Sequence, residues 1–155
     1  MIISTNNNDI LKSNEKIIAF PVNVEGFNDA GISYEILKKY WRNMIHSKEY
    51  KLGTVIPKNV NNIFLYALVC YSIKDGWINQ REIIKECFDK IKTNKPIATV
   101  EMGVQFLDKI EGADFNEIVL GMNDSKQEII LYSNYSLEHI LKICDEDKAK
   151  VKKKI

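Results

Sequence analysis

The chain has 155 residues, which suits one domain with a substantial core. Its 45% hydrophobic and 28% charged residues exclude global disorder. With 22 basic and 21 acidic residues the formal net charge is +1, so composition gives no support for general nucleic-acid binding and any anion site must be local.

Cysteine usage and the N-terminal segment bear on the compartment. Cys70, Cys87 and Cys144 lie far apart within apolar patterns, so we expect buried thiols in a reducing compartment and no metal site. Neither a leader-like segment nor an apolar run long enough for a membrane span is recognisable, which favours a cytoplasmic protein that does not bind membranes. Abundant Asn and Lys are typical of a low-GC bacterium or one of its phages, and a phage protein would lie in the host cytoplasm.

The first half of the chain alternates strands and helices. Residues 2–5 predict a short strand, and the apolar run 17–22 predicts a strand buried on both faces, with Asn23 at its end. Gly26 and Gly31 bracket a loop, after which apolar positions at three-and-four spacing predict a helix over 31–45. Residues 54–57 and 63–71 predict two strands joined as a hairpin by the Asn-rich segment 58–62.

The second half continues the alternation. Asn79, with Glu82 three residues later, is expected to cap a helix that ends before Pro96. A strand at 97–102, a partly helical segment over 106–120 and a strand at 126–132 follow. Ser136 predicts a cap for a short helix over 138–143. We expect one domain over residues 1–145, an α/β/α sandwich of three layers with a mixed sheet, and a fraying charged tail over 146–155.

The strand, Asn, loop and helix start at residues 17–32 form a layout suited to a sugar and a diphosphate. The first turn of a helix has free backbone N–H groups that attract phosphate, and here Ala30, Gly31 and Ile32 would present them. Ligands of open α/β sheets lie at the carboxyl ends of strands, where Asn23 and Gly103 are both expected. Two loops could therefore enclose one ligand.

These residues resemble the macro domains, a family that binds ADP-ribose and its relatives. The resemblance rests on Asp9-Ile10, Asn23, Gly26 and Gly31-Ile32, and on a strand that ends in a loop from Gly103 to Phe106. It covers roughly residues 2–143 and implies a macro-domain-like fold that binds ADP-ribose or a derived signalling nucleotide, with no cofactor. It leaves the oligomeric state open.

The resemblance also implies individual roles. Asp9 would accept a hydrogen bond from the adenine amino group, the backbone N–H of Ile10 would donate to the ring, and Asn23 would contact the distal ribose. The alternatives are that Asp9 caps a turn after the preceding Asn run, and that Asn23 bonds neighbouring backbone to end the strand. The full expected ligand-binding set is Asp9, Ile10, Asn23, Gly26, Phe27, Ala30, Gly31, Ile32, Gly103, Val104, Gln105 and Phe106.

Two positions depart from the family pattern. Asp29 would repel a diphosphate unless its side chain turns away. Gln105 stands where the second glycine of the phosphate loop is expected, so it would contact a ribose or an altered ligand, or be an exposed loop residue. Phe27 and Phe106 would stack on a base or cover a ribose, or belong to the core.

The catalytic pattern of one branch of the family is incomplete here. That branch uses a Lys in the strand matching residues 63–71 and an Asp after the glycine loop, whereas this strand has no Lys and the nearest Asp is Asp108. Candidates for orienting water are Asn23, Asp29 and Asp108. Binding, with sequestration of the nucleotide, is therefore favoured over ADP-ribosyl hydrolase or ADP-ribose phosphate phosphatase activity. A further alternative is a protein-interaction module on the same fold.

Overall fold

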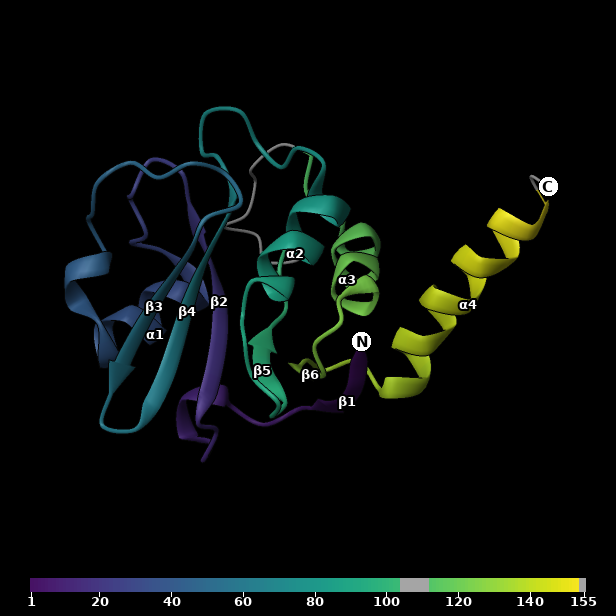
Figure 1. Cartoon of the computed structure of the whole chain (residues 1–155), viewed down its shortest axis with the longest axis horizontal. Helices are drawn as coiled ribbons and strands as arrows, with labels where there is room; N and C mark the ends of the chain where they lie inside the picture. The colour runs from purple at the N-terminus through teal and green to yellow at the C-terminus, as the bar shows by residue number, and fades with distance from the viewer. Residues whose placement is uncertain (104–111, 154–155) are drawn as a thin grey trace.

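The computed structural model describes residues 1–103 and 112–153, and within them the strands form one mixed sheet in the order β1-β6-β5-β2-β4-β3 (Figure 1). Neighbouring strands are parallel except for the hairpin of β3 and β4, which is antiparallel. The expected mixed sheet is confirmed. The strands are β1 (Ile2–Asn6), β2 (Ile17–Asn23), β3 (Val55–Val60), β4 (Ile63–Tyr71), β5 (Ile97–Val100) and β6 (Ile129–Tyr132).

Helices cover both faces of this sheet. The helices are α1 (Gly31–Tyr40), α2 (Gln80–Asp89), α3 (Phe115–Asp124) and α4 (Leu137–Lys153), and two 3-10 turns lie at Ile10–Lys12 and Arg42–Met44. All seven residues of β2 are buried because the strand has a core on each side. Phe20 packs in the core beneath α1, whereas Ala19 packs in the core beneath α2 and α3. The predicted three-layer sandwich is confirmed.

Several predicted boundaries move for local reasons. The helix expected over 31–45 ends at Tyr40, because Trp41 has φ −154° and a 3-10 turn follows it. Asn79 precedes α2 in a left-handed conformation with φ 47° and makes no side-chain cap bond, contrary to the prediction. The hairpin turn is confined to Asn61 and Asn62, both at positive φ, which Asn tolerates better than most residues.

The last helix is longer than predicted. It continues from Leu137 to Lys153 instead of ending near Ile143, and its far end leaves the body of the molecule (Figure 1). The sequence beyond Ile143 is rich in Lys, which favours helix, and Asp147 is held by Arg81 at 3.1 Å. Local propensity and one ion pair thus extend the helix into the segment expected to fray.

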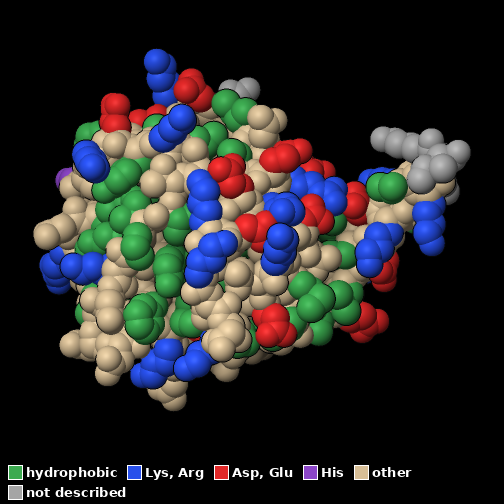
Figure 2. Space-filling view, viewed as in Figure 1, with side chains coloured by type: hydrophobic (Ala, Val, Ile, Leu, Met, Phe, Trp, Pro, Cys, Tyr) green, Lys and Arg blue, Asp and Glu red, His purple; other side chains and the backbone are tan. Residues whose placement is uncertain are grey.

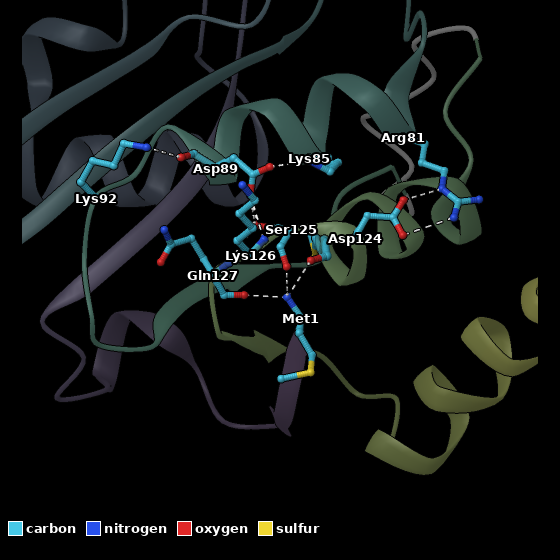
Figure 3. A network of polar contacts seen from close by, with 10 residues as sticks. Met1, Arg81, Lys85, Asp89, Lys92, Asp124, Ser125, Lys126 and Gln127 are labelled. Carbon is cyan, nitrogen blue, oxygen red and sulfur yellow. Dashed lines mark hydrogen bonds and ion pairs between the residues drawn. The ribbon is translucent and has the colours of Figure 1, made fainter.

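A polar network joins α2, the end of α3 and the start of β1 (Figure 3). Asp89 accepts from Lys85 Nζ at 2.6 Å and from the backbone N–H of Lys126 at 2.8 Å, while Arg81 donates to Asp124. The Met1 nitrogen donates to the backbone carbonyl oxygens of Ser125 and Gln127. Partial burial opposes ionisation of Asp89, but hydrogen bonds from Lys85, Lys126 and Ser125 outweigh it and lower its pKa.

The surface and the thiols agree with the bulk composition. Figure 2 shows basic and acidic side chains interspersed over the α2 and α4 part of one face. Cys70, Cys87 and Cys144 are buried, as expected, and burial raises the pKa of Cys87 to about 12. Among the described helices none has the length and apolarity needed to cross a membrane. The described residues also contain no group of three or more His, Cys, Asp or Glu side chains that could hold a metal ion.

Candidate functional site

Two adjoining hollows lie at the carboxyl ends of the parallel strands. The wide hollow, of about 180 Å³, is lined by the segment after β1, the ends of β5 and β6, and the start of α1. The narrow hollow, of about 20 Å³, is lined by the first turn of α1, the ends of β2 and β4, Trp77 and the segment after β5. Ile32 and Glu101 line both, so the two hollows adjoin, and together they are called the cleft below.

Asp9 and Ile10, two of the predicted ligand-binding residues, border the wide hollow. Asp9 Oδ1 also accepts from the backbone N–H of Leu11 at 2.9 Å and thereby caps the 3-10 turn. The bond of the alternative interpretation is therefore present. It occupies one carboxylate oxygen only, and the other has no partner among the described residues, so contact with adenine stays a prediction.

Asn23 is held by the loop that follows it and does not line either hollow. Its side chain is committed to Phe27: Nδ2 donates to the carbonyl oxygen at 2.6 Å, and Oδ1 accepts from the N–H at 3.1 Å. Asn23 is only 2% exposed, and its own backbone N–H donates to Asn28 Oδ1. These are the backbone bonds of the alternative interpretation, and a ribose contact by Asn23, which also stays a prediction, would have to replace them.

Gly26 and Phe27 likewise lie outside the two hollows. Gly26 has φ 79°, and a Cβ there would lie 2.6 Å from the carbonyl oxygens of Ser47 and Lys48. The close approach that requires glycine is therefore made to the chain's own backbone. Phe27 is 56% exposed and packs edge-on against His46.

Asp29 turns away from the cleft. Its Oδ2 lies 3.4 Å from His46 Nε2, and both side chains are largely exposed. With its carboxylate in this position, Asp29 would not repel a diphosphate bound at the start of α1, which was the difficulty noted from the sequence.

The start of α1 faces the narrow hollow. Ala30, Gly31 and Ile32 line it, as predicted, and Ala30 provides no side-chain cap for the N–H groups of the first turn. Ser33 Oγ donates to the carbonyl oxygen of Pro21 at 2.6 Å, which fixes this turn against β2. The helix start therefore presents uncapped donors, and a partial positive charge, to a hollow.

Trp77 is a residue of this cleft that the sequence did not identify. It is 6% exposed, its ring stacks on Tyr71 at 4.9 Å, and both residues line the narrow hollow. Its Nε1–H is buried and has no hydrogen-bond partner among the described residues. Buried indole N–H groups usually find a partner, so this donor is unusual among the described residues, and Trp77 lines the same hollow as the start of α1.

Glu101 is the second residue that the sequence missed. It follows β5, lines both hollows, and accepts hydrogen bonds from Ser133 Oγ and from the backbone N–H of Asn134. A polar residue directly after a buried strand was the available signal. Nearby, Tyr132 OH donates to Glu15 at 2.8 Å, and burial, together with this bond, raises the pKa of Tyr132.

The segment after β5 is described only in part. Gly103 has φ 77° and lines the narrow hollow, as predicted. A Cβ at Gly103 would lie 2.9 Å from Ile118 Cδ1, the movable end of a side chain of α3, so the positive φ is the stronger reason for glycine here. Val104, Gln105, Phe106 and the candidate Asp108 lie outside the described residues.

The sequence matches no protein-family model and no curated protein. The structure resembles the macrodomain of Thermus aquaticus DarG at 11% identity and a TM-score of 0.60, covering 86% of this chain and 98% of that one. It also resembles the Mycobacterium tuberculosis DarG macrodomain at 13% identity and a TM-score of 0.59, covering 86% and 99%. The chain has the macrodomain fold. The resemblance drawn from the sequence is thus confirmed at the level of the fold.

A third macrodomain with a similar structure was solved with a ligand. It is a macrodomain mutant from Oceanobacillus iheyensis, solved with ADPR, with 14% identity and a TM-score of 0.56, and the likeness covers 96% of this chain and 92% of that one. At such low identity the macrodomain fold is shared, whereas the residues that line the cleft must be argued from this chain alone.

Proposed function

We propose that this macrodomain binds ADP-ribose or a nucleotide derived from it in the cleft at the carboxyl ends of β1, β6, β5 and β2. The observation that carries the proposal is that the two hollows adjoin, with Ile32 and Glu101 lining both. One end offers the free carboxylate oxygen of Asp9, an acceptor suited to an adenine amino group. The other offers the uncapped first turn of α1 and the indole N–H of Trp77, which has no partner among the described residues; both are donors suited to phosphate.

The neighbours support this ligand class because one of them was solved with ADPR. The cleft also suits it chemically, since acceptors gather at the Asp9 end and donors at the α1 end. The narrow hollow has room for about one water in the unliganded structure, so the proposal requires its walls to separate when a phosphate enters.

Binding without turnover is favoured over hydrolysis. Two of the three candidates for orienting water are engaged elsewhere: Asn23 bonds to Phe27, and Asp29 contacts His46. A domain that holds a nucleotide without cleaving it would sequester that nucleotide. We expect no release of ADP-ribose from modified protein or DNA, and no phosphate from ADP-ribose phosphate, under conditions where ligand binds. Turnover of any of these substrates would establish the hydrolase alternative instead.

Isothermal titration calorimetry tests the binding itself. ADP-ribose should bind with one-to-one stoichiometry, and adenosine, which lacks the phosphates, should bind at least about tenfold more weakly because it leaves the donors of α1 and Trp77 unused. ADP should fall between them. Absence of heat with ADP-ribose at millimolar concentration, for protein with a normal unfolding transition, would reject the proposal.

A further inference from the structure

Glu101 introduces a carboxylate into the middle of the cleft. It is one of two residues, with Ile32, that line both hollows. Glu101 lines the wide hollow together with Asp9. It lines the narrow hollow together with the first turn of α1. Any ligand that spans the cleft must therefore pass this side chain.

The carboxylate is held in place. Ser133 Oγ donates to Oε1, and the backbone N–H of Asn134 donates to the same oxygen at 3.2 Å. Ser133 is itself 6% exposed, so the principal anchor comes from a buried residue at the end of β6. The remaining oxygen, Oε2, has no hydrogen-bond partner within residues 1–103 and 112–153. One oxygen thus orients the group and the other is available to a ligand.

An ionised carboxylate accepts hydrogen bonds and donates none. It complements hydroxyl groups and repels phosphate. In a ligand with adenine at Asp9 and phosphates at α1, the part between them is the ribose of the adenosine moiety, which carries adjacent 2′ and 3′ hydroxyls. A carboxylate that accepts from a ribose 2′-hydroxyl is a known means of excluding a 2′-phosphate from dinucleotide sites on another α/β fold.

We propose that Glu101 recognises the 2′-hydroxyl of the adenosine ribose, and that the cleft consequently selects ADP-ribose over its 2′-phosphorylated counterpart. This inference rests on the proposed function, because it assigns a specificity to the same cleft. It concerns the nucleotide class that the cleft admits: derivatives of a dinucleotide with a free 2′-hydroxyl, and not those of its 2′-phosphorylated form.

The test compares ADP-ribose with ADP-ribose 2′-phosphate and with 2′-deoxy-ADP-ribose by calorimetry. Wild-type protein should bind the 2′-phosphate about 100-fold more weakly than ADP-ribose, and the deoxy ligand about tenfold more weakly. Glu101→Gln keeps the size of the side chain and removes its charge. It should bring the 2′-phosphate to within a few-fold of ADP-ribose and reduce the penalty for the deoxy ligand.

Two further variants separate specificity from general effects of charge and order. Glu86→Gln removes the same charge from α2, where Glu86 pairs with Lys90, and should leave all three affinities unchanged. Ser133→Ala removes the anchor and keeps the charge, so it should weaken ADP-ribose about threefold while the 2′-phosphate stays strongly disfavoured. Unfolding midpoints measured alongside identify any variant that fails to fold.

The wild-type measurements alone can overturn the inference. Equal binding of ADP-ribose and its 2′-phosphate would reject the role of Glu101 and leave the proposed function intact. Absence of binding by both would reject the proposed function and the inference with it. Retention of the full wild-type preference in a folded Glu101→Gln protein would also reject the assignment, since the selectivity would then come from another residue.

Discussion

Two polar regions of this molecule use their charged groups in opposite ways. Around Asp89 the acceptors and donors meet one another: Lys85, Ser125 and Lys126 all donate to one carboxylate. In the cleft, Asp9 and Glu101 each have one oxygen bonded and one without a partner among the described residues. The difference teaches where to look for function, because a satisfied network stabilises the fold, whereas an incompletely paired one is available to a ligand.

The largest expected effect is on stability and comes from the Asp89 region. Asp89→Ala should lower the free energy of unfolding by about 2–3 kcal/mol, because it leaves the Lys126 N–H and the Ser125 hydroxyl without their charged acceptor. Chemical denaturation would measure this. Affinity for ADP-ribose should not change, and a loss of affinity in the folded variant would break the division between the two regions.

The pH dependence of the free energy of unfolding should report the ionisation of Asp89. The pKa of Asp89 is lowered in the folded protein, so its contribution is present above the unfolded-state pKa and is lost as pH falls through the lower folded-state value. The stability difference between wild type and Asp89→Asn should therefore be full at neutral pH and shrink below about pH 4. A difference that grows on acidification would contradict this assignment.

A variant of Asn23 distinguishes a structural role of this side chain from a ligand-binding role. Asn23→Ala removes both bonds to Phe27 and should cost about 1–3 kcal/mol of stability, because the backbone N–H and carbonyl of Phe27 lose their partners. Affinity should fall less than tenfold in protein that remains folded. Should thermal melts stay unchanged while calorimetry shows a large loss of affinity, the ribose role implied by the family resemblance would be the correct one.

A variant of Asp9, unlike one of Asn23, should lose affinity for the ligand and keep its stability. Asp9→Ser keeps a side-chain oxygen that can cap the 3-10 turn and removes the free carboxylate oxygen, so stability should stay within about 0.5 kcal/mol of wild type. Affinity for ADP-ribose should fall about tenfold, the value of one hydrogen bond to a charged group. Asp9→Ala, which loses the cap as well, is the matched comparison. Equal affinities of wild type and Asp9→Ser would remove Asp9 from the binding set.

Replacing Trp77 should have the smallest effect on affinity, and it should change affinity and stability in different directions. Trp77→Phe keeps an aromatic ring against Tyr71 and removes an N–H that has no partner among the described residues. Affinity should fall about threefold, whereas stability should stay level or rise by up to about 1 kcal/mol. A clear loss of stability without loss of affinity would instead make the indole a structural group.

Much of this architecture was predictable from local patterns. The run at 17–22 is apolar without interruption, which requires a strand with cores on both sides, and β2 has them. Gly31 and the periodic residues after it predicted the start of α1 at the correct position. Where local signals failed, a tertiary contact intervened, as in α4, which continues as helix to Lys153 with Asp147 bound by Arg81.

The site divides along the same line. Asp9, Ile10, Ala30, Gly31, Ile32 and Gly103 were expected at the site from the family resemblance and the loop pattern, and all of them border the hollows. By itself the amino-acid sequence determined most of the individual strands and the start of α1, because each depends on neighbours a few residues away. Only the tertiary structure decided that Asn23 and Gly26 serve the loop, and that Trp77 and Glu101 enter the cleft, because those contacts join segments tens of residues apart.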